Sequence, residues 1–286
     1  MSGVDFASVL QGWSETEPTV SGLVLIGSRE RAETDEVWKA DQNSDWDFQI
    51  ITSTPDRFLS SDWMRALPGV VVSVYALRMT KIGSVPKVNV VFNGGEADFI
   101  ILPERLFQMA RLLTWLGAHK REGGLRRGLQ DLAVVIRPGW RFLKGRSLWE
   151  PFYERVVTGV ADPRLSDQQI RRLADSFVAD YVWTLRKLRR GEWVAARRML
   201  HRELAETTLM LLHEARLREG LRSFPEGRRL ERIASDEEVA RVVVNGGLDG
   251  AGLASALEEA AASLRGLAER LLPGRWHWPA DINSER

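Results

Sequence analysis

Two aspartates separated by one residue lie at the start of a β-strand pattern. This spacing favours a strand that carries both carboxylates on one face of a sheet. Asp45 and Asp47 lead directly into the apolar run of residues 48–52. Because successive side chains of a strand point to opposite faces, both carboxylates are expected on the same face of a sheet. A third acid, Asp98, lies in a second strand pattern over residues 96–102. Carboxylates grouped in this way are typical ligands of a divalent metal ion.

The first half of the chain carries the patterns of a sheet with a few helices around it. Further strands are expected over residues 21–26, 70–79 and 87–92, and helices over residues 4–13, 55–67 and 103–116. Asn93-Gly94-Gly95 precedes the strand that contains Asp98 and is a signal for a hairpin turn. A second hairpin is expected from residues 129–136 and 140–143.

The second half of the chain has helical periodicity. Ser166-Asp167-Gln168-Gln169 is a capping box, and apolar residues recur at helical spacing over residues 170–188. Further helices are expected over residues 192–219 and 253–272. We therefore expect an α+β chain of two domains. Residues 1–148 would form a mixed β-sheet with flanking helices, and residues 149–286 an α-helical bundle.

Composition excludes several classes of chemistry. The chain has no cysteine, which excludes disulfides, thiolate nucleophiles and metal sites with cysteine ligands. No basic-then-apolar leader opens the sequence, and no uncharged run approaches the ~20 residues that span a bilayer. We therefore expect a cytoplasmic protein without a membrane partner.

Charge is distributed unevenly along the chain, although the net charge is only +1. Residues 1–54 contain ten acidic and three basic residues, whereas basic residues prevail over residues 164–232. An acidic segment beside a metal site would suit a cationic substrate, and arginine-rich helices could meet a triphosphate. Solvated helix faces explain most of these charges equally simply.

The small-residue turn Gly27-Ser28, the Asp45-x-Asp47 pair and the later Asp98, in this order, resemble the DNA polymerase β-like nucleotidyltransferase superfamily. Within it, the chain is most similar to aminoglycoside 6-adenylyltransferases of the streptomycin-modifying type. The narrower likeness is carried by residues 61–64, 87–92 and 101–103. The resemblance implies a nucleotidyltransferase domain in residues 1–148 and a substrate-enclosing helical domain in residues 149–286.

The resemblance also implies roles for the residues of the motif. Transfer of a nucleoside monophosphate to a hydroxyl requires neutralisation of the triphosphate and in-line placement of the acceptor oxygen. Asp45 and Asp47 are expected to hold Mg²⁺, with two ions and ATP as co-substrate. Asp98 would be a third metal ligand or the base that receives the acceptor's proton. Gly27, Ser28 and Arg29 are expected to contact the phosphates.

A second candidate for the base lies in the helical half. Arg190-Gly191-Glu192 sits at a helix junction and resembles a short stretch in the second domain of these adenylyltransferases. Glu192 is therefore the alternative base, although a glutamate that caps the helix end explains the same position. We favour Asp98, because a strand beside the metal carboxylates places a base more rigidly than a helix end does.

These residues predict a Mg²⁺-dependent enzyme that moves AMP from ATP to a hydroxyl of a small cationic molecule. By resemblance the acceptor is an aminoglycoside antibiotic, and the activity would confer resistance. The alternative is a toxin–antitoxin nucleotidyltransferase that modifies a protein or a tRNA end, and a third possibility is a non-catalytic nucleotide-binding module. The acidic triad, which consists of Asp45, Asp47 and Asp98, disfavours a non-catalytic nucleotide-binding module. The large helical domain favours a small acceptor over nucleic acid. The sequence leaves open the acceptor, the choice among ATP, GTP, CTP and UTP, and the oligomeric state, with a monomer favoured.

Overall fold

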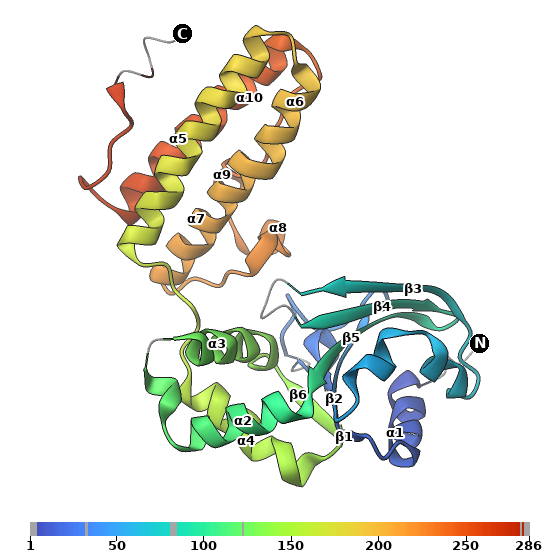
Figure 1. Cartoon of the computed structure of the whole chain (residues 1–286). Coiled ribbons are helices and arrows are strands. Elements are labelled where there is room, and N and C mark those ends of the chain that lie inside the picture. The colour runs from blue at the N-terminus through green and yellow to red at the C-terminus, as the bar shows by residue number, and fades with distance from the viewer. Residues whose placement is uncertain (1–4, 32–33, 81–84, 122, 281, 283–286) are drawn as a thin grey trace. The chain divides into compact units, whose positions relative to one another are not determined.

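The computed structural model describes residues 5–31, 34–80, 85–121, 123–280 and 282 (Figure 1). The chain divides into two compact units, Met1–Pro163 and Arg164–Arg286. The division thus lies beyond the expected boundary after residue 148, which falls inside helix α4 (Arg146–Gly159). The physical reason is burial, because Trp149 and Tyr153 of α4 are fully buried in a core of the first unit.

The first unit is built on a six-stranded mixed sheet with the strand order β3-β4-β5-β2-β1-β6. The strands are β1 (Val20–Ile26), β2 (Trp46–Thr52), β3 (Val72–Met79), β4 (Pro86–Phe92), β5 (Gly95–Pro103) and β6 (Trp140–Lys144). The central pair β2 and β5 is parallel, and the other neighbouring strands pair in antiparallel fashion. The expected strands of the acidic motif are therefore neighbours at the centre of the sheet.

Helical segments cover both faces of this sheet (Figure 1). The segments are α1 (Phe6–Thr16), α2 (Glu104–Trp115), α3 (Gly124–Ile136) and α4, with the 3-10 turns η1 (Gly27–Glu30), η2 (Pro55–Leu59), η3 (Asp62–Ala66) and η4 (Ala118–Lys120). One core joins α1, η2 and η3 to one face, and a second core joins α3 and α4 to the other.

Alternation along the strands supplies the two cores. Phe48 and Ile50 of β2 are fully buried on the α1 side, whereas Ile51 is fully buried on the side of α3 and α4. Because side chains alternate between faces, a strand that is covered on both sides reads as a continuous apolar run. This explains why Phe48, Ile50 and Ile51 are all apolar although they lie on both faces of the strand.

Two local expectations are wrong. Residues 129–136, expected as a hairpin strand, form the end of α3, and Leu129, Ala133 and Ile136 are its buried positions. Spacings of four and three residues place these side chains on one face of a helix. A short apolar run can form either a strand or a helix, and this spacing favours the helix. Residues 55–67, expected as one helix, instead contain the short turns η2 and η3.

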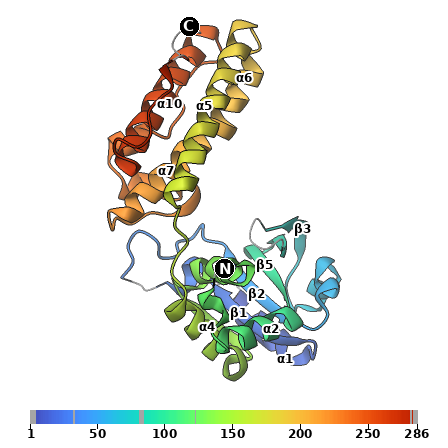
Figure 2. The ribbon, with the colours of Figure 1, turned by 60° about the vertical axis from the view of Figure 1, so that its left-hand side comes forward.

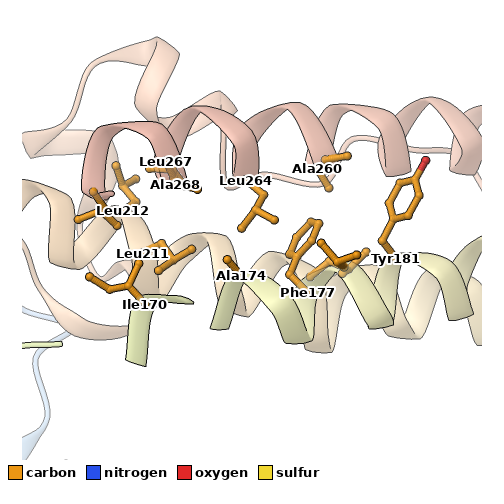
Figure 3. Close-up of a cluster of buried hydrophobic side chains, with 14 of the residues drawn as sticks. Ile170, Ala174, Phe177, Tyr181, Leu211, Leu212, Ala260, Leu264, Leu267 and Ala268 are labelled. Atoms are coloured by element: carbon orange, nitrogen blue, oxygen red, sulfur yellow. The ribbon is translucent and has the colours of Figure 1, made fainter. Parts of the chain in front are cut away.

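The second unit is an α-helical bundle, in which α5, α7 and α10 run side by side (Figure 2). Its elements are α5 (Asp167–Arg189), α6 (Trp193–Met199), a π-helical turn (Leu200–Leu204), α7 (Ala205–Arg218), η6 (Pro225–Gly227), α8 (Leu230–Ile233), α9 (Asp236–Ala240) and α10 (Gly250–Leu271). Figure 3 shows how Phe177 of α5, Leu211 of α7 and Leu264 of α10 meet in one apolar core. The expected bundle is confirmed.

Local signals fix the ends of the first helix of the bundle. Ser166 and Gln169 form the predicted capping box, which satisfies backbone donors at the start of α5. Gly191 has a φ of 71°, and this left-handed conformation turns the chain from α5 into α6. None of the described helices has both the length and the apolar character needed to cross a bilayer.

Candidate active site

Three aspartates come together at one end of the parallel strand pair. Asp47 of β2 lies directly opposite Asp98 of β5, and Asp45 immediately precedes β2. One carboxylate oxygen from each residue lies within 4.8 Å of the others, and all three residues are half-buried. The parallel register of β2 and β5 brings Asp98 to the pair that strand alternation predicted, because it places equivalent side chains next to each other.

The cover on this face of the sheet ends before the triad. Gln49 and Ile51 follow Asp47 on the same face and are almost completely buried. The phenolic oxygen of Tyr153 in α4 donates a 2.5 Å hydrogen bond to Oε1 of Gln49. The α4 layer therefore covers the middle of β2, and the half-buried carboxylates of Asp45 and Asp47 lie beyond it, within reach of solvent.

Two polar neighbours of Asp98 were missed as site residues in the sequence. The Nζ of Lys87 lies 2.5 Å from Oδ2 of Asp98, and Nδ2 of Asn89 donates a hydrogen bond to Oδ1 of Asp98. Asn89 is the cross-strand partner of Asp98 in the hairpin of β4 and β5. The hairpin turn could have revealed Asn89 in the sequence, because a turn that pairs Phe92 with Gly95 fixes Asn89 opposite Asp98.

Glycine is required at position 27 by the site itself. Gly27 has a φ of 80°, and a Cβ atom added there would lie 2.3 Å from Oδ2 of Asp47. A side chain at this position would collide with the carboxylate and would also strain the backbone. The backbone at Gly27 therefore passes directly beside Asp47, and contact of Gly27 and Ser28 with phosphate stays a prediction.

Arg29 holds the loop that carries Asp45. Its Nε donates a 3.0 Å hydrogen bond to the carbonyl oxygen of Asp45, and its Nη2 donates to the carbonyl oxygen of Ser44. The guanidinium carbon lies 4.0 Å from the centre of the Trp46 ring. Burial lowers the pKa of Arg29, and the nearby carboxylates, Asp45 foremost, oppose this shift. These contacts give Arg29 a positioning role, and contact with phosphate stays a prediction.

Glu192 belongs to the second unit, at the residue before α6. Its Oε2 lies 2.5 Å from Nζ of Lys187, and its Oε1 lies 3.8 Å from Nη1 of Arg190. The hydrogen bond from Lys187 lowers the pKa of Glu192, and Arg190 adds to this effect. The side chain makes no capping hydrogen bond, so the helix-cap explanation is wrong. The carboxylate of Glu192 is thus held by cations of its own helix junction, and a role for it as the base stays a prediction.

The donor set suits a hard divalent cation. Asp45, Asp47 and Asp98 offer oxygen ligands, which Mg²⁺ prefers, and no thiolate occurs in the chain. Oδ1 of Asn89 is buried beside them and has no hydrogen-bond partner among the described residues. An acceptor without a partner at this position suits a site that orders water around a metal ion.

Comparison with known proteins finds similarity to solved structures only at low sequence identity. No protein-family model matches the chain, and no curated protein matches its sequence. The chain is similar to an aminoglycoside 6-adenyltransferase from Bacillus subtilis, with 13% identity over 98% of this chain and 93% of that chain and a TM-score of 0.41. It is also similar to a nucleotidyltransferase-like protein from Exiguobacterium sibiricum 255-15, with 12% identity over 93% and 76% of the two chains and a TM-score of 0.36. The function of this chain is therefore inferred from the residues of its own site.

Proposed function

We propose that this chain is a Mg²⁺-dependent nucleotidyltransferase that moves AMP from ATP to a hydroxyl of a small molecule. The observation that carries the proposal is the group formed by Asp45, Asp47 and Asp98, whose carboxylate oxygens lie within 4.8 Å of one another. The close approach of Gly27 to Asp47 supports it, because a side-chain-free turn leaves room for phosphate oxygens beside the metal ligands.

Each residue of the site has a separate task in this reaction. Asp45 and Asp47 would hold the metal ions, which when bound neutralise the triphosphate and polarise the phosphorus–oxygen bond. The acceptor oxygen then bonds to the α-phosphorus, the bond to the β-phosphate oxygen breaks, and pyrophosphate leaves. Asp98 would receive the hydroxyl proton, and its contacts with Lys87 and Asn89 fix the orientation of its carboxylate.

The acceptor proposed is an aminoglycoside, as the sequence resemblance implies. The acidic excess of residues 1–54 supports a cationic acceptor, because negative potential around a site attracts cations. Use of ATP would place the reaction in the cytoplasm, and transfer to an antibiotic would give resistance. The first unit would supply the metal and phosphate contacts.

Transfer of labelled nucleotide tests this proposal directly. The full chain is incubated with Mg²⁺, an aminoglycoside panel and each of the four α-³²P-labelled nucleoside triphosphates. We expect label from ATP on an aminoglycoside, and a loss on the order of 10²-fold or more in Asp45→Asn and Asp47→Asn, because each removes charge that stabilises the transition state. Asp62→Asn is the matched control, since this side chain is 74% exposed and lies on η3.

The outcomes separate the parts of the proposal. Near-normal turnover in Asp47→Asn would show that the metal assignment is wrong. Label on a protein or a tRNA in place of the small molecule would replace the proposed acceptor with the toxin–antitoxin alternative. Absence of transfer from all four nucleotides to every acceptor would overturn the enzymatic proposal.

A further inference from the structure

An apolar cavity of about 380 Å³ lies in the first unit, within the layer formed by α2, α3 and α4. Its lining includes Gln49 and Ile100 from the sheet, Leu106 and Phe107 from α2, and Gly128 and Leu132 from α3. A cavity of this size matches a small-molecule site rather than a packing defect. No residue of the cavity is used by the proposed reaction.

The cavity lies next to the acidic triad. Gln49 follows Asp47 by two residues on β2, and Ile100 follows Asp98 by two residues on β5. Residues two apart on a strand share a face and are separated by ~7 Å. A ligand whose reacting group lies at the carboxylates would therefore reach the cavity with a part of the molecule that is only a few bonds from that group.

The lining selects an uncharged occupant. Asp131 is the one charged side chain among the described residues that form the cavity, and burial raises its pKa. The amide oxygen of Gln49 already accepts a hydrogen bond from Tyr153. A polycation would find too few counter-charges here, and the polar edge of a nucleobase too few hydrogen-bond partners. An apolar ring or chain has neither charges to pair nor hydrogen-bonding groups to satisfy, so its burial here carries neither cost.

Gly128 keeps part of this space open. It lies inside α3, where glycine is less favourable than alanine because of its backbone entropy. A Cβ atom added at Gly128 would have no other atom within 4 Å. No neighbour therefore requires a glycine, and at this exposed lining position the cavity is open to solvent.

We propose that this cavity binds an uncharged apolar ring or chain of the hydroxyl acceptor, while the reacting hydroxyl lies at the triad. The inference rests on the proposed nucleotidyl transfer and narrows its acceptor class. The preferred acceptor is a hydroxylated molecule with a hydrophobic portion, and any cationic groups of the acceptor lie outside the cavity.

A matched pair of probes tests the cavity without relying on catalysis. Binding of n-hexyl β-D-glucoside and methyl β-D-glucoside to the full-length Asp47→Asn chain is measured by calorimetry. The two probes carry the same sugar hydroxyls, and only the first has an apolar chain. We expect the hexyl compound to bind at least tenfold more tightly, because each buried methylene group favours binding.

Two variants assign the preference to the cavity. Gly128→Leu places a side chain in the open space, and Leu106→Asp puts a charge at a lining residue that is 55% exposed and tolerant of substitution. Each should reduce the preference for the hexyl compound to less than threefold. Gly128→Ala is the control, since one methyl group leaves most of the cavity free and should preserve the preference. Equal affinity for the two probes, or an unchanged preference in both Gly128→Leu and Leu106→Asp, would overturn the proposal.

A transfer experiment separates this inference from the proposed function. The same pair is offered to the wild-type chain with labelled ATP and Mg²⁺, and we expect a KM at least tenfold lower for the hexyl compound. Transfer without this preference would overturn the cavity's role and leave the proposed function intact. Probe binding without transfer to any acceptor would overturn the proposed function, and with it the role of the cavity as an acceptor site.

Discussion

Asp98 is the acid of the site whose orientation is most firmly held. Both of its oxygens have partners on β4, since Asn89 donates to Oδ1 and Lys87 lies at Oδ2. Its backbone lies between Asn89 on one side and Asp47 on the other, in the middle of the sheet. Rigid placement of this kind favours in-line chemistry, because small displacements of a catalytic group reduce the rate strongly.

We predict that Asp98, and not Glu192, receives the acceptor's proton. Asp98→Asn should lower the single-turnover rate on the order of 10²-fold or more, as expected for loss of a general base, with little change in ATP affinity. Glu192→Gln should leave this rate within a few-fold, because Glu192 does not belong to the carboxylate group of Asp45, Asp47 and Asp98. Rapid-quench measurements at saturating acceptor distinguish the two. A slow chemical step in Glu192→Gln beside a normal one in Asp98→Asn would reverse the assignment.

The sequence predicted the acids of the site better than their partners. Alternation along one strand was enough to place Asp45 and Asp47 near each other, and the motif order supplied Asp98. Lys87 and Asn89 were missed because their role depends on strand register, which only the hairpin turn determines. The contacts of Arg29 with the carbonyl groups of its neighbouring loop leave no pattern in the sequence.

At the scale of single elements, α7 carries a half-buried histidine. Nδ1 of His213 lies 2.8 Å from Oγ of Ser223. Burial lowers the pKa of His213 below its ordinary value of 6.5, and Arg164 adds to this, whereas Glu214 opposes it. The folded chain therefore binds a proton at His213 less readily than the unfolded chain does.

This difference predicts how stability depends on pH. Between the folded pKa and about 6.5, the unfolded state binds more protons, so the free energy of unfolding falls as the pH falls through this window. The loss from this group is at most about 1.4 kcal/mol per pH unit. Urea unfolding at pH 7.5 and pH 5.5 should show a larger loss for the wild type than for His213→Gln. Identical losses in the two proteins would contradict the prediction.

Elements were predicted well where one signal was dominant. The capping box at Ser166 and the hairpin turn at Asn93-Gly94-Gly95 located an element end that the structure confirms. Residues 129–136 were misassigned because a short apolar run fits a buried strand and a buried helix equally well. Packing against the sheet and α4 selects the helix, and this information is not local to the run.

For the whole molecule, the boundary between the two units determines which fragment can fold. Cutting after residue 148 would remove Trp149, Tyr153 and most of α4 from the first unit. The face of the sheet that contains Val24 and Ile51 would then lose the part of its cover that α4 supplies. Exposed apolar area of this kind destabilises a fold and promotes aggregation.

We predict that residues 1–163 form a stable fragment and that residues 1–148 do not. Loss of several fully buried aromatic side chains exceeds what a typical domain can tolerate, since each contributes about 3–5 kcal/mol. Thermal unfolding followed by circular dichroism should be cooperative for the longer fragment only, and gel filtration should show aggregation of the shorter one. Equal cooperativity in the two fragments would mean that α4 is not part of the first unit's fold.

The central claim is that Asp45 and Asp47 hold a metal ion beside Asp98, and direct metal binding tests it. Mn²⁺ binding to the full chain is measured by electron paramagnetic resonance for the wild type, Asp47→Asn and the exposed control Asp62→Asn. We predict equal affinity for the wild type and Asp62→Asn, and a loss of tenfold or more in Asp47→Asn, about 1.4 kcal/mol of binding free energy. Binding of Mn²⁺ to Asp47→Asn with wild-type affinity would contradict the metal site and the function proposed from it.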